Sequence, residues 1–244
     1  MTKTVWATLA LIVTAISAQA QTFSAQDLAR RTIERRAVEA AIWGMPLVNT
    51  DAMRQAYFRD VGAKYNDICY FSKPQDWKFQ VTTPNASTNY IYFNYNLKDG
   101  PVVVEMPAAV NAGLLGSMVD AWDEPMTDIG PAGEDQGKGG KYLLLPPDFK
   151  GDTPAGFFPI RYPTYNGYAL YRAIRNGTTD ADTAAALALV KKLRVYPFAQ
   201  AATPQNNASS TFTARRSMAS PTSTSVSLRT STAWFRKSRC YRAT

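Results

Sequence analysis

Histidine is absent from this 244-residue sequence, and cysteine occurs only at Cys69 and Cys240. Without histidine, the chain has no serine–histidine or cysteine–histidine nucleophilic site, no histidine metal ligand and no histidine acid–base catalyst. Two cysteines allow at most one long-range disulfide, in an oxidising compartment. Because Cys240 lies in an unusual tail, described below, we expect the two cysteines to remain unpaired.

The excess of positive charge is confined to the two ends of the chain. The net charge is +8, but Lys3 and seven basic residues after Pro204 hold the whole excess. Residues 21–203 contain all 19 acidic residues and an equal number of basic ones. A positive charge predicts nucleic acid as a partner where it is concentrated on the folded part of a protein. The sequence therefore predicts no nucleic-acid partner.

The first 20 residues have the pattern of a secretory signal peptide. Lys3 precedes an apolar run at residues 5–16, and Ala18 and Ala20 are the small residues that signal peptidase requires before its cut. The apolar run is shorter than the roughly 20 residues that span a bilayer. We expect cleavage after Ala20, no stable membrane anchor afterwards, and a periplasmic or secreted bacterial protein.

The body of the chain, residues 25–201, begins with a helical pattern and continues with strand patterns. Ser24 and Asp27 mark a helix start, and Pro46 should end or kink that helix before a second helical piece near 50–57. Alternation with a period of two then predicts strands at residues 90–97, 102–106, 114–122, 141–145, 157–162 and 168–174.

A short helix is expected near residues 179–193, because Asp180 and Asp182 begin this segment and Lys191 and Lys192 end it. Together these elements predict an α+β fold that is mainly β. Its N-terminal helix packs on an antiparallel β-sandwich or jelly-roll-like sheet.

Residues 204–244 differ in composition from everything before them. They are basic and rich in Ser and Thr, yet they contain aromatic residues, including Trp234, that disordered tails seldom hold. If one nucleotide is missing near codon 208, the original codons are recovered by joining the last base of each present codon to the first two bases of the next. The codon that begins in Trp234 then encodes valine, and the one that begins in Cys240 encodes leucine, which are residues of an ordinary folded segment. We therefore expect a disordered, out-of-frame tail produced by a frameshift.

Several motifs, taken together, resemble one bacterial family. They are TPNAST at 83–88, DGPVVV at 99–104, DAW at 120–122 and AAIWGMPL at 40–47. Over residues 25–201 the chain resembles the family named domain of unknown function 1254 (DUF1254). The resemblance implies a jelly-roll-like fold, export, and a DUF1214-like domain that normally follows in cis and is missing here. It implies no reaction, and the family's pattern has an acid where this chain has Ser87.

Four carboxylates lie within nine positions around Trp122; they are Asp120, Asp123, Glu124 and Asp128. One protonated and one ionised carboxylate beside an aromatic ring are what glycoside hydrolysis needs, so Asp120, Asp123 and Glu124 are candidate catalytic residues. Such a group can also bind Ca²⁺, but the spacing matches no calcium loop and we predict no metal ligands. The interpretation we favour is a solvated loop at a strand end, with Trp122 in the core.

A polar run precedes the first aromatic strand and provides candidate ligand-binding residues. They are Asn85, Thr88, Tyr90 and Tyr92, together with Trp122. Amide groups beside tyrosine rings suit recognition of a sugar or an amide, although the run also fits a turn with Asx and Ser caps. The sequence thus predicts a domain that binds a small molecule or glycan. The alternative is a glycan- or amide-directed hydrolase that uses the carboxylates near Asp120, and the sequence predicts no particular cofactor.

Overall fold

The computed structural model describes residues 23–71, 88–202 and 239–241. They divide into two compact units, with the boundary between Met45 and Pro46. Helix α2 (Ala25–Val61) contains residues of both units. It begins where the sequence predicts, because Ser24 Oγ accepts the N–H of Asp27 at 3.0 Å and so caps the first turn.

Pro46 lies inside α2, so the helix does not end there, and the helical piece predicted near 50–57 is the continuation of the same helix. Pro46 has no N–H to donate to the carbonyl of Ile42, which removes one helical hydrogen bond. The residues that follow it bury one side of the helix. They are Thr50, Ala52, Met53, Ala56, Tyr57 and Val61. We infer that burial of these side chains outweighs the single lost hydrogen bond and keeps the helix continuous.

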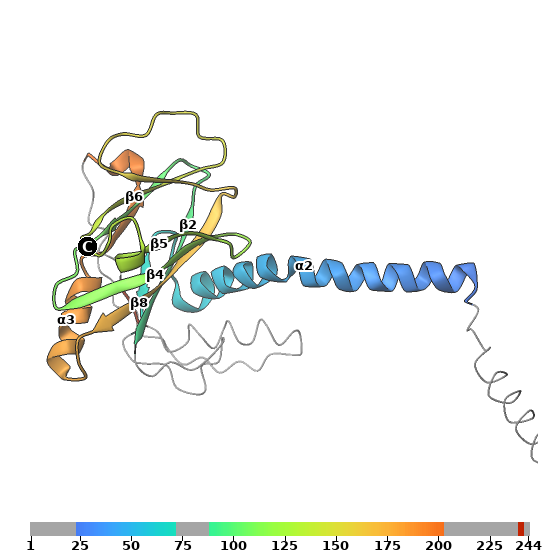
Figure 1. The fold of residues 1–244 in the computed structure, drawn as a ribbon, viewed down its shortest axis with the longest axis horizontal. Coiled ribbons are helices and arrows are strands. Elements are labelled where there is room, and N and C mark those ends of the chain that lie inside the picture. Colours follow the sequence, from blue (N-terminus) through green and yellow to red (C-terminus); the bar gives the residue numbers. More distant parts are fainter. Residues whose placement is uncertain (1–22, 72–87, 203–238, 242–244) are drawn as a thin grey trace, which may run out of the picture. The chain divides into compact units, whose positions relative to one another are not determined.

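The strands form two sheets (Figure 1). The six-stranded sheet has the order β10-β1-β2-β8-β4-β5. Its strands are β1 (Ile68–Tyr70), β2 (Asn89–Asn96), β4 (Ala112–Asp120), β5 (Pro125–Ile129), β8 (Asn166–Arg175) and β10 (Arg239–Tyr241). The four-stranded sheet has the order β7-β6-β3-β9, with β3 (Val102–Met106), β6 (Gly140–Leu145), β7 (Phe158–Arg161) and β9 (Arg194–Pro197). Among the described pairings only β6 with β7 is parallel, which confirms the predicted mainly β, mostly antiparallel fold.

The main core lies between the two sheets and is built by strand alternation. Ile91, Phe93 and Tyr95 of β2 point into it, where they meet Val102 and Val104 of β3. Helix α3 (Asp180–Val190) adds its buried residues to the same core, and Thr179 begins it with a capping box. The predicted short helix near 179–193 is therefore confirmed. Two 3₁₀ turns, η1 (Gly130–Ala132) and η2 (Phe198–Gln200), complete the described helices.

The opposite face of β2 is covered by α2. Tyr90 and Tyr92 point to this side and pack in a second core with Met53, Ala56 and Tyr57 of the helix. Because both faces of β2 are covered, nearly every residue of the strand is buried. Among the described residues, none of the helices combines the length and apolar character needed to cross a membrane.

The short strands β1 and β5 were not predicted, and part of β5 falls in a segment expected to be a loop. For the residues of β9 the sequence leaves a loop and a short extended piece open, and the structure shows the extended form. Strand β10 is the only part of 204–244 that the structure describes, so the disordered, out-of-frame tail stays a prediction. Cys69 is disulfide-bonded, and its register partner in β10 is Cys240. The expectation that the cysteines remain unpaired is therefore wrong. Antiparallel pairing of β1 with β10 brings their backbones to a separation that a disulfide can span.

Candidate functional site

The predicted catalytic carboxylates lie in the turn between β4 and β5. Asp120 is 1% exposed, and its Oδ1 accepts the N–H groups of Trp122 at 2.8 Å and Glu124 at 3.0 Å. Asp123 and Glu124 are exposed, and Asp123 has a φ of 67°. One oxygen of Asp120 therefore holds the turn in place.

The carboxylates of this turn differ in burial and in hydrogen-bond partners. Asp120 is buried, with Oδ2 lacking a hydrogen-bond partner among the described residues, and Asp123 accepts a hydrogen bond from the Tyr168 hydroxyl. In the part of the chain that the structure describes, no group of His, Cys, Asp or Glu side chains is arranged to hold a metal ion. The catalytic roles of Asp120, Asp123 and Glu124 stay predictions.

The predicted ligand-binding residues are spread along the six-stranded sheet. Asn85 lies outside the described residues, and half-buried Thr88 precedes β2. Trp122 belongs to the turn that follows Asp120. Asp120 at the end of β4 and Asn96 at the end of β2 both pair with the start of β8, so this turn lies beside the other end of β2. The eight residues of β2 separate these two ends, which corresponds to roughly 26 Å. Thr88 and Trp122 therefore lie near opposite ends of β2, and their binding roles stay predictions.

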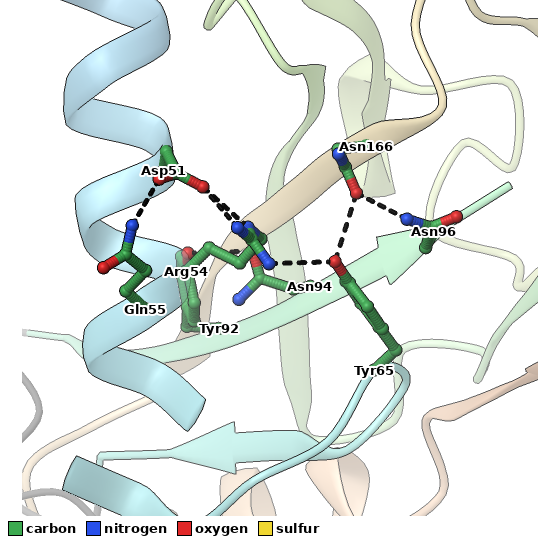
Figure 2. Close-up of polar contacts among 8 residues, drawn as sticks. All are labelled: Asp51, Arg54, Gln55, Tyr65, Tyr92, Asn94, Asn96 and Asn166. Atoms are coloured by element: carbon green, nitrogen blue, oxygen red, sulfur yellow. Dashed lines mark hydrogen bonds and ion pairs between the residues drawn. The ribbon is translucent and has the colours of Figure 1, made fainter. Parts of the chain in front are cut away.

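The structure brings together a different group of polar side chains, which we call the polar cluster (Figure 2). It consists of Asp51, Arg54, Gln55, Tyr65, Tyr92, Asn94, Asn96 and Asn166. Arg54 Nη1 donates to the Tyr65 hydroxyl at 3.2 Å, and that hydroxyl donates to Asn166 Oδ1, also at 3.2 Å. Asn96 Nδ2 donates to the same oxygen at 2.6 Å. The cluster thus joins α2, the loop after it, and the ends of β2 and β8.

Local structure fixes the position of Tyr65 in the loop that follows α2. The Tyr57 hydroxyl donates to the Asp67 carbonyl and also lies 3.2 Å from the Lys64 carbonyl, and Asp67 Oδ2 accepts the N–H of Lys64 at 2.8 Å. The rings of Phe58 and Tyr65 meet edge to face with centroids 4.9 Å apart. These contacts tie the loop to the end of the helix, so Tyr65 is held where Arg54 and Asn166 can reach it.

The two charges of the polar cluster neutralise each other. Arg54 Nε donates to Asp51 Oδ1 at 3.0 Å, and Gln55 Nε2 donates to Asp51 Oδ2. Burial acts to raise the pKa of Asp51, but the hydrogen bonds from Arg54 and Gln55 outweigh it and hold the pKa below its ordinary value. Burial likewise acts to lower the pKa of Arg54, and the hydrogen bond to Asp51 raises it overall. Both side chains are therefore charged at neutral pH, and the rest of the cluster is neutral.

Tyr92 links the polar cluster to the predicted turn. Its hydroxyl donates to Asn94 Oδ1 at 3.2 Å, and its ring lies 5.4 Å from that of Tyr168. The Tyr168 hydroxyl in turn donates to Asp123. Of the predicted residues, Tyr92 belongs to the cluster, and Asp123 is connected to it through Tyr168, which sequence reasoning missed.

Most of the polar cluster was not predicted, because its members come from segments far apart in the chain. Arg54, Tyr65 and Asn166 carry no local motif. The sequence did offer one signal: Asn94 and Asn96 continue a strand face that begins with tyrosines, so the residue type along that face changes from aromatic to amide. Polar amides on a covered face indicate a hydrogen-bonded site instead of simple core packing.

The sequence profile of the family described as Protein of unknown function (DUF1254) matches residues 65–197, more than half of the chain. The chain belongs to this family. The matched segment contains every described strand except β10, and all of the polar cluster except its three residues on α2. No curated protein matches the chain.

Among solved structures, the DUF1254 chain is similar to the VPA0106 protein from Vibrio parahaemolyticus. The TM-score is 0.52 at 16% identity, over 79% of this chain and 44% of that one. A match to an uncharacterised protein from Burkholderia cenocepacia has a TM-score of 0.34 at 14% identity, over 82% of this chain and 49% of that one. The chain spans less than half the length of either protein, and the likeness to VPA0106 concerns the fold alone.

Proposed function

We propose that this DUF1254 chain binds a small neutral polar molecule or a glycan at the polar cluster. The observation that supports this most directly is the concentration of neutral donors and acceptors on one face of β2 and β8, beside tyrosine rings. Side-chain amides and phenol hydroxyls match the hydroxyl and amide groups of sugars. Arg54 and Tyr65 are only part-buried, so the cluster has polar groups within reach of solvent.

A binding role needs fewer groups than the hydrolase alternative does. Hydrolysis of a glycoside requires two carboxylates that both reach the scissile bond. Asp120 is buried and engaged by the turn, whereas Asp123 and Glu124 are exposed, and no observation favours a shared site for them. We therefore propose binding without assigning a reaction.

A glycan array followed by calorimetric titration of the purified full chain tests this proposal. Asn166→Ala removes the oxygen that receives the hydrogen bonds of Tyr65 and Asn96, so we expect it to weaken binding about tenfold or more. The matched control is Asn176→Ala, because Asn176 is exposed just beyond the opposite end of β8 and should leave binding unchanged. Absence of binding to any glycan or small polar probe, or equal effects of the two variants, would contradict the proposal.

We also propose that residues 1–20 direct export of the protein and are removed by cleavage after Ala20. The signal-like residues 1–20 lie outside the described residues, and the support comes from their sequence. Sequencing of the N-terminus of the protein from fractionated cells tests it, with Gln21 as the expected first residue. An N-terminus at Met1 or Thr2 in the cytoplasmic fraction would contradict export.

A further inference from the structure

Strand β8 has an asparagine–glycine pair at each of its ends. The pairs are Asn166-Gly167 at its start and Asn176-Gly177 just after its last residue. In such a pair the backbone nitrogen of the glycine can attack the side-chain carbonyl of the asparagine, because glycine has no Cβ to hinder the approach. This reaction is one reason why asparagine is a thermolabile residue. The structure places the two pairs in different surroundings.

The first pair is held by hydrogen bonds and by the sheet. Asn166 Oδ1 accepts hydrogen bonds from the Tyr65 hydroxyl at 3.2 Å and from Asn96 Nδ2 at 2.6 Å. Gly167 is buried, and it pairs with β2 on one side and β4 on the other. Attack by the Gly167 nitrogen therefore requires this end of β8 to leave the sheet and the asparagine to lose both partners.

The second pair is exposed, in the bend that joins β8 to α3 (Figure 1). The two ends of this bend are fixed, because Arg175 pairs with Ala112 of β4 and a capping box begins α3 at Thr179. Between these ends, the described part of the chain provides no hydrogen bond to the Asn176 side chain or to the Gly177 N–H. The two reacting groups can therefore meet without the loss of a contact that stabilises the fold.

We propose that Asn176-Gly177 is a site of spontaneous deamidation in the folded protein, whereas the fold protects Asn166-Gly167. The Gly177 nitrogen forms a bond to Cγ of Asn176, and the bond from Cγ to Nδ2 breaks. The amide group leaves as ammonia with the proton of the Gly177 nitrogen, and a succinimide ring remains. Water then adds to either ring carbonyl and opens the ring to aspartate or isoaspartate, so the only co-reactant is water.

The reaction changes the chain beside the start of α3. Each product carries one more negative charge than Asn176 does, and isoaspartate also adds a methylene group to the backbone of the bend. The modified form therefore accumulates with the age of the protein. Because this site and the polar cluster lie at opposite ends of β8, the inference is independent of the proposed binding function.

Peptide mapping of the full chain tests the proposal. Samples are incubated at mildly alkaline pH, folded or in concentrated urea, and then digested with trypsin. The pairs fall in separate tryptic peptides, residues 162–172 and 176–191, and neither peptide contains another asparagine or glutamine. In the folded chain we expect the second peptide to lose ammonia about a hundredfold faster than the first, because the first pair must open before it reacts. In urea the two rates should be similar.

Two neighbouring substitutions separate the chemistry from the fold. Gly177→Ala places a Cβ beside the attacking nitrogen and should slow the reaction of Asn176 in both the folded and the unfolded chain. Thr178→Ala changes the next exposed residue of the bend and should leave the rate unchanged. If circular dichroism shows that Gly177→Ala does not fold, the two peptides of the unaltered chain still decide the proposal.

Three outcomes would overturn the proposal. Equal rates for the two pairs in the folded chain would show that the fold does not select between them. A folded chain in which Asn176 stays intact, although it reacts in urea, would show that the bend holds the pair apart. A product that contains aspartate without isoaspartate would exclude the succinimide route, since opening of the ring yields both.

Discussion

For two buried tyrosines of the same core, we predict that replacement by phenylalanine changes the stability of the fold in opposite directions. Tyr95 and Tyr171 are both 0% exposed and both point between the sheets, from the neighbouring strands β2 and β8. The Tyr95 hydroxyl donates to the carbonyls of Val119 at 2.8 Å and Tyr168 at 3.1 Å, and it lies 2.8 Å from the Tyr162 hydroxyl. The Tyr171 hydroxyl has no hydrogen-bond partner among the described residues.

The magnitudes follow from counting what each hydroxyl leaves behind. Because Tyr95 has one proton to donate to the carbonyls, its oxygen is the acceptor for Tyr162. Tyr95→Phe therefore leaves the Tyr162 hydroxyl unpaired and a carbonyl under-satisfied, at a cost of about 1–3 kcal/mol for each buried group, or about 3 kcal/mol in total. Tyr171→Phe removes a group that was desolvated without compensation, so its effect should lie between zero and about 1 kcal/mol of stabilisation.

Urea unfolding of the two variants, followed by circular dichroism with the disulfide left intact, measures this difference. With a denaturant dependence of about 2–3 kcal/mol per molar for a domain of this size, the midpoints should differ by about 1 M. The ring contacts are nearly matched, since both tyrosines lie beside Phe93, so the comparison isolates the hydroxyl groups. Equal destabilisation by the two substitutions would refute the hydrogen-bond accounting of the core.

Three further predictions concern the tyrosines, a glycine and the predicted turn. Burial, more than any other cause, raises the pKa of seven buried tyrosines; they are Tyr92, Tyr95, Tyr142, Tyr162, Tyr168, Tyr171 and Tyr196. Their neutral forms stabilise the fold fully below about pH 10, and above it each tyrosine lowers the free energy of unfolding by about 1.4 kcal/mol per pH unit. The tyrosinate absorbance of these buried tyrosines should therefore rise in one cooperative step together with alkaline unfolding, whereas a gradual rise of the absorbance of all 13 tyrosines in a folded protein would contradict this. Gly130→Ala should destabilise the chain by about 3 kcal/mol or more in urea unfolding. Gly130 has a φ of 81°, and an added Cβ would lie 2.1 Å from the Leu114 carbonyl oxygen. A loss of stability below about 1 kcal/mol, the size of a simple propensity effect, would show that the turn adapts. Asp120→Asn keeps an oxygen for the two turn N–H groups and should retain most of the stability of the fold. Asp120→Ala removes that oxygen and should lower the free energy of unfolding by about 2 kcal/mol or more. Equal losses for the two variants in the same assay would show that the negative charge matters.

Long strands were predictable from the sequence because their alternation is repeated over enough residues to be read. The pattern in β2 and β8 continues for eight and ten residues, and both strands lie where it predicts. Strand β1 has three residues and β9 has four, too few for a period of two to be distinguished from a loop. Of the two effects expected at Pro46, an end or a kink, α2 does not show the end, because the local rule about one lost hydrogen bond takes no account of burial against a sheet.

The site was less predictable than the fold, since local sequence shows which groups are polar but not which of them the backbone has already engaged. Asp120 looked reactive in the sequence, but its Oδ1 is occupied by two N–H groups of its own turn. Asn94 looked like one more position in an aromatic strand, but it keeps a buried donor that no described group accepts. An unpaired atom alone does not mark a site, because the Tyr171 hydroxyl is unpaired too. The two differ in their neighbours: Tyr171 lies in the closed core between the sheets, whereas Asn94 contacts Tyr92 beside the part-exposed Arg54. The covered amide of Asn94 therefore lies beside polar groups that solvent can reach, whereas the Tyr171 hydroxyl does not.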